Sequence, residues 1–157
     1  MRIVVTGGAG FIGSNLVREL LREGHQAVVL DDFSTGLREN LSGLDVELYD
    51  GSILDSQLLK LAFAGADSVI HLAAIPSVPR SVANPLRSHE ANATGTVLVL
   101  EAARDVGCHV VVASSSSVYG ANPQMPKVET MVPMPRSPYA ASTARASVVT
   151  VASAMPR

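Results

Sequence analysis

The sequence predicts an α/β fold in which a doubly wound parallel sheet is covered by helices on both faces. Two observations indicate this class: short, wholly apolar runs alternate along the chain with longer stretches whose apolar residues recur at helical spacing. Strands without polar alternation are typical of a parallel sheet that is buried on both faces. The alternation of strand and helix then implies right-handed crossovers between parallel strands.

The elements follow one another in a regular order. The first strand is expected at residues 3–5, and the helix after it carries apolar residues from Ile12 onward and ends at Gly24. Asp55 is expected to cap the next helix, which continues through Leu61. The remaining elements are expected as strands at residues 27–30, 46–48, 68–71 and 109–113, a long helix at residues 85–106 and one long loop at residues 123–138.

Composition and charge exclude several classes of protein. The 157 residues give room for one domain with a buried core, and 47% apolar with 17% charged residues excludes a disordered chain. The net charge is −2 and no basic cluster occurs, so no nucleic-acid partner is expected. No apolar run approaches the roughly 20 residues of a membrane span, and no metal site is expected.

The N-terminus and the single cysteine favour a cytoplasmic protein. The segment before Gly7 is too short for a signal peptide and is expected to form a strand instead. The single cysteine, Cys108, leaves no internal disulfide, which suits the cytoplasm, and its place beside an apolar run predicts a packing role.

A glycine-rich turn lies between the first strand and the first helix. Gly7, Gly10 and Gly13 recur at intervals of three, as a tight turn, close approach of a pyrophosphate and close packing of helix on strand require. The amides at the start of the helix, with its partial positive charge, would hold the phosphates. The pattern therefore predicts a Rossmann-type dinucleotide-binding fold.

An acidic residue at the end of the second strand selects the cofactor. Asp31 follows Gly13 by 18 residues, where a carboxylate accepts hydrogen bonds from the adenosine ribose and repels the extra phosphate of NADP. Asp32 either shares this role or faces solvent. No arginine follows before Arg38, so NAD is the expected cofactor.

Several further motifs make a family resemblance specific. The segments at residues 7–13, 31–36, 71–74, 114–120 and 137–142 resemble those of the extended short-chain dehydrogenase/reductases, within them the NAD-dependent epimerase/dehydratase family, and most of all its UDP-sugar 4-epimerases. The resemblance covers residues 1 to about 142. It implies contacts of residues 34–36 with the adenosine ribose, of residues 52–53 with adenine and of residues 72–74 with the nicotinamide ribose. The expected cofactor-binding residues are Gly7, Gly10, Phe11, Ile12, Gly13, Asp31, Asp32, Ser34, Thr35, Gly36, Ser52, Ile53, Leu72, Ala73, Ala74 and Asn92.

The resemblance also implies a reaction. In such enzymes a tyrosinate removes a proton from a sugar hydroxyl while hydride passes to NAD, and the 4-keto sugar turns over before hydride returns. By position Tyr139 would be the base and Ser115 would share a hydrogen bond with the reacting hydroxyl. Serines at 116 and 117, where dehydratases carry an acidic pair, favour epimerisation or simple redox chemistry. Alternatively, the serine run is a plain turn and Tyr139 a packing residue.

The sequence departs from the family at residue 143. The family lysine, which lies one helical turn after the tyrosine and lowers its pKa, is replaced by Thr143, so Tyr139 is expected to be a poor base. Two alternatives to a UDP-sugar epimerase therefore stay open, a non-catalytic NAD-binding module and an NAD-dependent reductase of a smaller carbonyl substrate.

The chain is expected to divide into a Rossmann domain at residues 1–142 and an atypical tail at residues 143–157, without the family's C-terminal substrate domain. One hypothesis for the tail is a change of reading frame or an early end of the coding sequence. The rival hypothesis is a natural short protein in which residues 139–154 dock as a helix. An unpaired sheet edge is expected as well, and with it a homodimer or poor solubility.

Overall fold

Five parallel strands form one sheet in the part of the chain that the structure describes. The computed structural model describes the backbone of residues 1–153 and the side chains of residues 1–147. The strands are β1 (Arg2–Thr6), β2 (Gln26–Asp31), β3 (Glu47–Asp50), β4 (Ser68–His71) and β5 (His109–Val112), and their order across the sheet is β3-β2-β1-β4-β5. The fold class predicted from the sequence is confirmed.

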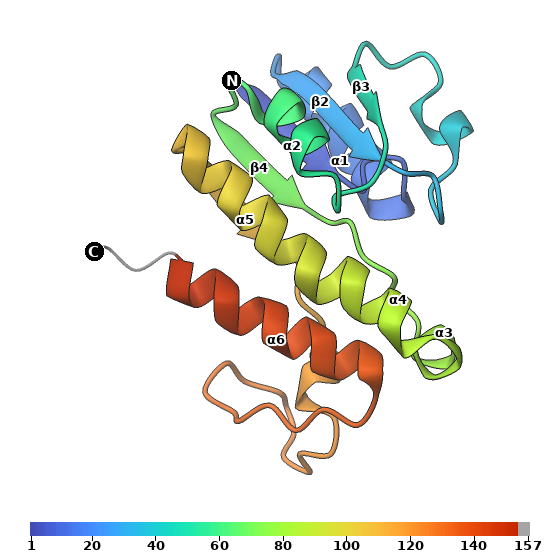
Figure 1. The fold of residues 1–157 in the computed structure, drawn as a ribbon, viewed down its shortest axis with the longest axis vertical. Helices are drawn as coiled ribbons and strands as arrows, with labels where there is room; N and C mark the ends of the chain where they lie inside the picture. The colour runs from blue at the N-terminus through green and yellow to red at the C-terminus, as the bar shows by residue number, and fades with distance from the viewer. Residues whose placement is uncertain (154–157) are drawn as a thin grey trace.

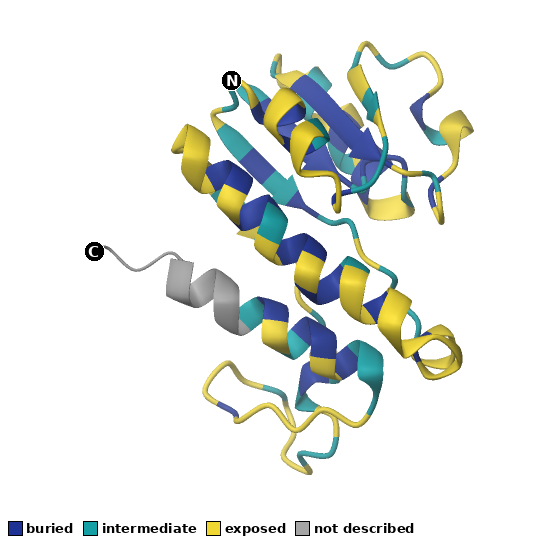
Figure 2. Cartoon of the chain, in the orientation of Figure 1, coloured by how far each residue is buried: buried dark blue, intermediate teal, exposed yellow. Residues whose placement is uncertain are grey.

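Helices cover both faces of this sheet (Figure 1). Helix α1 (Phe11–Arg22) packs on one face through Val17, against Val5 and Val29 of the strands. Helices α2 (Ser56–Phe63) and α5 (Gly95–Val106) pack on the other face. Their core residues meet the alternate strand residues Val4, Val28 and Val69, as the two-residue period of a strand requires. Figure 2 shows the resulting buried layer through the middle strands.

Two helix ends, the start of α2 and the end of α5, have the capping residues that the sequence predicts. The Asp55 side chain caps α2 by accepting hydrogen bonds from the N–H groups of Gln57 at 2.9 Å and Leu58 at 3.1 Å. Gly107 ends α5 in the left-handed region, with φ of 72°. Among the described helices, none is long and apolar enough to cross a membrane.

The long helix predicted at residues 85–106 is divided in the structure. It consists of α4 (Pro85–His89), a π-helical turn η2 (Glu90–Thr94) and α5. The wide turn brings the side chain of Asn92 against the loop that follows β4, where it is hydrogen-bonded. Gly95 then passes close to Ile53, since a Cβ there would lie 2.4 Å from Ile53 Cδ1. The helical period predicted the helix but not this local widening.

Two further differences concern short elements. Helix α3 (Val78–Ala83) was not predicted, although the Ser77 side chain caps it. Strand β3 lies at Glu47–Asp50 rather than at residues 46–48, because its pairing with β2 runs from Val28 to Asp31. Helix α6 (Pro138–Ser153) begins where the predicted loop ends, after the short helix η3 (Ser116–Tyr119).

Helix α6 runs without interruption across residues 142 and 143. Its first turns are docked, since Ala140, Ser142, Thr143 and Ala146 are buried. The helix packs beside α3, α4 and η2, on the outer side of the α5 layer (Figure 1). The side chains of residues 148–157, which include much of the predicted tail, lie outside the described residues.

The connections around β1 create the position for a site. β1 pairs with β2 on one side and with β4 on the other, so the chain reverses its direction of winding at this strand. In sheets of this type ligands bind at the carboxyl ends of the strands beside such a reversal. The turns after β1, β2 and β4 all open at that edge.

Candidate dinucleotide site

The turn after β1 has the tight geometry that its glycines predict. Gly7 has φ of 71°, and a Cβ there would lie 2.7 Å from the backbone nitrogen of Ala73. A Cβ at Gly13 would lie 2.2 Å from the carbonyl oxygen of Gly7, so α1 packs directly on the turn. At Gly10, by contrast, the nearest atom to an added Cβ is 3.3 Å away. A Cβ at position 10 would thus be tightly but not impossibly placed, and glycine there also leaves the backbone accessible to a ligand.

The start of α1 is uncovered. Gly10 is the N-cap residue and provides no side-chain cap, and the first turn holds no acidic residue. Phe11 and Ile12 are 84% and 67% exposed, which is unusual for large apolar side chains. Free amides and the positive end of the helix dipole therefore face the crevice, as an anion requires.

Asp31 at the end of β2 is held in place by the same turn. Its two carboxylate oxygens accept one hydrogen bond each, from the N–H groups of Ala9 and Phe33, both at 2.9 Å. Burial raises the pKa of this carboxyl, and the two backbone hydrogen bonds oppose that rise. The oriented oxygens keep further lone pairs available for a hydroxyl partner.

One cavity of about 680 Å³ joins these features. Its size is that of a site for an organic ligand or cofactor. Most residues predicted to bind the cofactor line it; these are Gly7, Gly10, Phe11, Ile12, Gly13, Asp31, Asp32, Ser34, Thr35, Ser52, Ile53, Leu72, Ala73, Ala74 and Asn92. Gly36 is not among the lining residues. It packs behind them, because a Cβ there would lie 3.0 Å from an Asp31 oxygen.

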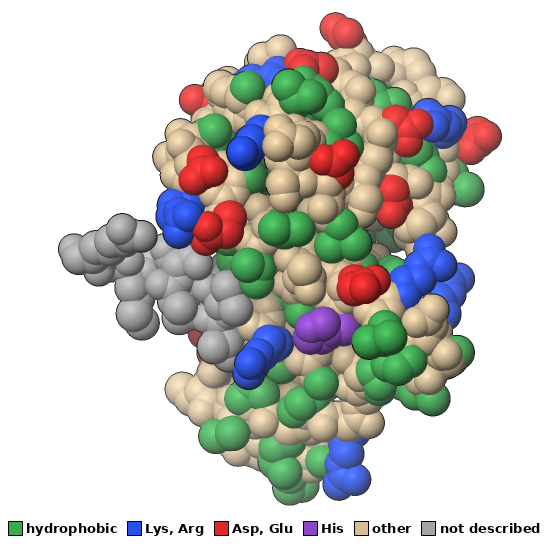
Figure 3. All heavy atoms as spheres, viewed as in Figure 1, with side chains coloured by type: hydrophobic (Ala, Val, Ile, Leu, Met, Phe, Trp, Pro, Cys, Tyr) green, Lys and Arg blue, Asp and Glu red, His purple; other side chains and the backbone are tan. Residues whose placement is uncertain are grey.

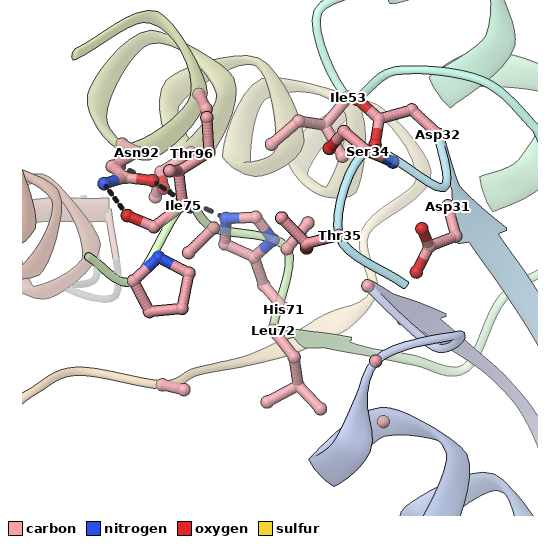
Figure 4. A pocket seen from close by; sticks show the side chains of 18 of the residues that line it. Asp31, Asp32, Ser34, Thr35, Ile53, His71, Leu72, Ile75, Asn92 and Thr96 are labelled. Atoms are coloured by element: carbon pink, nitrogen blue, oxygen red, sulfur yellow. Dashed lines mark hydrogen bonds between the residues drawn. The ribbon is translucent and has the colours of Figure 1, made fainter. Parts of the chain in front are cut away.

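A buried hydrogen-bond chain supports the floor of the cavity (Figure 4). His71 Nε2 lies 3.0 Å from Thr96 Oγ1, and His71 Nδ1 lies 2.6 Å from Thr6 Oγ1 on the neighbouring strand. The Thr96 hydroxyl donates to the carbonyl of Asn92, so it accepts from His71, and the ring carries its proton on Nε2. Burial lowers the pKa of His71 to about 4. The ring therefore has a structural role, linking the end of β4 to β1 and to α5.

Asn92 clamps the loop that follows β4. Its Oδ1 accepts the N–H of Ile75 at 2.7 Å, and its Nδ2 donates to the carbonyl of Ile75 at 3.3 Å (Figure 4). Because Leu72, Ala73 and Ala74 precede Ile75, this clamp fixes the cavity wall that they form. Asn92 therefore supports the cavity wall indirectly, by holding the loop after β4 in place.

Of the two residues predicted for catalysis, Tyr139 lines the cavity and Ser115 does not. Tyr139 and Thr143 of α6 line it together with Ser114. Ser115 is not a lining residue; it caps η3, where its hydroxyl accepts the N–H of Ser117 at 3.2 Å and lies 2.8 Å from the Ser117 hydroxyl. Ser114 was not predicted as a site residue. Ser115 was chosen instead because it lies four residues before Tyr119.

The two basic residues that line the cavity, Arg80 and Arg87, were also missed from the sequence. They come from α3 and α4, and α3 was not predicted at all. The available signal was a cap residue three positions before each arginine, Ser77 and Asn84. Among the described residues, no group of three or more His, Cys, Asp or Glu could hold a metal ion.

Three features define a dinucleotide-binding domain of the Rossmann class. They are the glycine turn before the uncapped start of α1, the buried acid at the end of β2, and the large cavity where the sheet reverses its direction of winding. Comparison with known families narrows the class. A model described as the NAD dependent epimerase/dehydratase family matches residues 3–155. The chain belongs to the NAD dependent epimerase/dehydratase family.

Individual relatives agree with this assignment. A UDP-glucose 4-epimerase of Mycolicibacterium smegmatis is 47% identical over 148 residues, which are 90% of this chain and 47% of the relative. The solved UDP-glucose 4-epimerase of Thermotoga maritima, with UDP-glucose, matches with a TM-score of 0.94 at 35% identity, over 98% of this chain and 51% of that one. DesIV of Streptomyces venezuelae, a dTDP-glucose 4,6-dehydratase with NAD bound, matches with a TM-score of 0.91 at 38% identity, over 97% and 51%. The chain thus spans about half the length of the relatives it matches.

Proposed function

We propose that this chain binds NAD in the cavity at the carboxyl edge of the sheet. The observation that carries the proposal is that one cavity joins the uncapped first turn of α1, the oriented carboxylate of Asp31 and Tyr139. The pyrophosphate would lie on the start of α1 and the adenosine ribose on Asp31. The nicotinamide end would point toward Tyr139. NAD in the structurally similar DesIV supports the same cofactor here.

For the protein as a whole, the proposed activity is 4-epimerisation of a UDP-sugar. The Mycolicibacterium and Thermotoga relatives both carry that name. The two residues after Ser115 favour an epimerase over a dehydratase, because neither Ser116 nor Ser117 can move a proton near neutral pH. NAD, when bound, takes up and returns the hydride. The chain's own contribution would be to hold the sugar hydroxyl and to accept its proton at the Tyr139 oxygen.

The alternative of a non-catalytic NAD-binding module is favoured by one observation. Thr143 stands where the family lysine is expected, and its hydroxyl is bonded to the backbone of its own helix. No cation is therefore supplied beside the phenol from that position. Binding without turnover is the expected behaviour of this alternative.

Calorimetric titration of the chain with NAD tests the proposal. In Gly10→Asp the added Cβ would lie 3.3 Å from the carbonyl oxygen of Gly7, a tight contact that a small backbone shift must relieve. Because aspartate is also a favourable helix N-cap, the fold is expected to persist. Its negative charge would occupy the amides and repel the pyrophosphate, which should lower NAD affinity at least about tenfold. Gly10→Asn keeps the size and the cap without the charge and serves as the control.

Either of two results would refute NAD binding at this turn. One is the absence of any heat of NAD binding by a folded wild-type chain. The other is equal affinity of the wild type and Gly10→Asp. Circular dichroism of each variant shows whether its fold is intact.

A further inference from the structure

Arg80 and Arg87 are unusual among the arginines of this chain. They are the only Lys or Arg residues among the described residues that line the cavity. Neither guanidinium forms a hydrogen bond or an ion pair within the described residues, whereas Arg2, Arg38 and Arg104 each pair with a carboxylate. Two uncompensated cations thus border a cavity of dinucleotide size.

The backbone holds both arginines in equivalent positions. Each is the third residue of a short helix, and each N–H is bound by the helix's own cap. The Ser77 hydroxyl accepts the N–H of Arg80 at 3.3 Å, and Asn84 Oδ1 accepts the N–H of Arg87 at 3.1 Å. A proline in the first turn of each helix restricts the backbone further. The two side chains therefore start from fixed points seven residues apart.

Two hydroxyl residues lie across the same space. Ser34 and Thr35 line the main cavity and also an adjoining space of about 370 Å³, which they share with Arg80 and Arg87. The turn is fixed by the Ser34 N–H, which donates to Asp32 Oδ1 at 2.9 Å. The hydroxyls themselves form no hydrogen bond within the described residues. Figure 3 shows Lys and Arg side chains at the edge of the molecule near α3 and α4.

All four groups are donors, which defines the ligand chemistry. Guanidinium groups donate only, and hydroxyls donate readily to a phosphate oxygen. The remaining charged lining residues are the acids Asp31, Asp32 and Glu90, none of which is ion-paired to either arginine. An anionic, acceptor-rich group at this place would satisfy the donors and offset the repulsion from the acids.

We propose that Arg80 and Arg87, together with Ser34 and Thr35, clamp the pyrophosphate of bound NAD on the side away from α1. The inference rests on the proposed function and extends it. Ser34 and Thr35 follow Asp31 by three and four residues, which places the clamp at the adenosine half of the dinucleotide. A sugar nucleotide would bind toward Tyr139, at the other end of the cavity. The clamp therefore contributes to binding of the cofactor and not of the sugar nucleotide.

The test compares NAD with adenosine, which has the ribose and base but no phosphate. The chain and the variants Arg80→Ala and Arg87→Ala are titrated with each ligand by calorimetry. Each substitution is expected to weaken NAD about tenfold and to leave adenosine unchanged, because a charge-assisted hydrogen bond to phosphate is lost. Arg87→Lys should recover part of the loss, since it keeps the charge but not the guanidinium fork. Arg136→Ala, an exposed arginine outside the cavity, is the matched control.

Three results overturn the clamp. NAD affinity unchanged in both Arg80→Ala and Arg87→Ala would show that the arginines do not contact phosphate. Equal losses for NAD and adenosine would assign them to the shape of the adenosine pocket. A larger loss for NADP than for NAD would place them at a 2′-phosphate instead. Failure of the proposed function looks different, because the wild-type chain would then bind NAD no better than the Gly10→Asp variant.

Discussion

The hydroxyl of Thr143 donates a hydrogen bond to the backbone carbonyl oxygen of Tyr139 at 2.9 Å. The Ser142 hydroxyl donates to the same carbonyl at 3.0 Å. Thr143 is therefore satisfied within its helix, although it lies one turn after Tyr139 and both residues line the cavity. The position is correctly placed to influence the phenol, but the residue in it brings no charge.

Restoring a cation at this position should activate the tyrosine. In Thr143→Lys the ammonium can extend into the cavity beside the phenol, and we expect it to favour the phenolate form of Tyr139. Ultraviolet absorbance of the phenolate during a pH titration measures this, with Tyr139→Phe as the subtraction. Thr143→Met lengthens the side chain without charge. Identical titrations of the Lys and Met variants would contradict the prediction.

The buried His71 should make stability depend on pH in a defined window. Its folded pKa is lowered to about 4 from 6.5, so the unfolded chain binds more protons between these values. The contribution of the neutral ring is complete above about pH 6.5 and is lost as the pH falls toward 4, by up to about 3 kcal/mol. Urea unfolding at several pH values measures it. The slope should vanish in His71→Gln and persist in the exposed His89→Gln; a slope unchanged in His71→Gln would refute the assignment.

The Asn92 clamp should stabilise both the fold and the cavity. Asn92→Leu removes two hydrogen bonds to Ile75 and leaves the N–H of that residue without its partner, so a loss of about 1–3 kcal/mol in the free energy of unfolding is expected. NAD affinity should fall too, because residues 72–74 lose their anchor. Chemical denaturation and calorimetry measure the two effects. Asn122→Leu, which removes one loop hydrogen bond, should cost less than 1 kcal/mol on the same scale. Similar losses from both variants would argue against a clamp.

The edge strand β5 should promote association of the chain. It ends the described sheet beyond β4, and Val111 on it is 49% exposed. Exposed apolar edge strands pair readily with other chains, and a lysine on the edge opposes this. Size-exclusion chromatography with light scattering should show dimers or larger species for the wild type and fewer for Val111→Lys. A monodisperse wild-type monomer would count against the prediction.

The sequence was most informative at positions where local backbone geometry requires one particular type of residue. The glycine spacing and Asp55 predicted the turn after β1 and the start of α2, because each depends on local backbone chemistry. Asp31 lies at the end of β2 as predicted, and its role at a ribose stays a prediction. The parallel order of the strands followed from their alternation with helices. The π-helical turn at Asn92 was not predictable, because it depends on the partner Ile75 at a sequence distance of 17 residues.

The two ends of the cavity also differ in how well the sequence predicted their residues. One half of the cavity is formed by turns that directly follow β1 and β2, so sequence position alone located its residues. The far half brings together Ser114, Tyr139 and Thr143 from elements separated by a long loop. Arg80 and Arg87 became visible only when α3 and α4 were placed against Ser34 and Thr35. The division of the chain at residue 142 stays a prediction, since α6 is continuous across that point.

The most direct test of the account is a pair of calorimetric titrations of the wild-type chain, one with NAD and one with NADP. Asp31 is fixed by Ala9 and Phe33 at the place proposed for the adenosine ribose, so a 2′-phosphate would meet a buried carboxylate there. NAD should bind at least about tenfold more tightly than NADP, because of this repulsion and the lost hydroxyl contacts. Binding of both dinucleotides with equal affinity, or of neither, would contradict it.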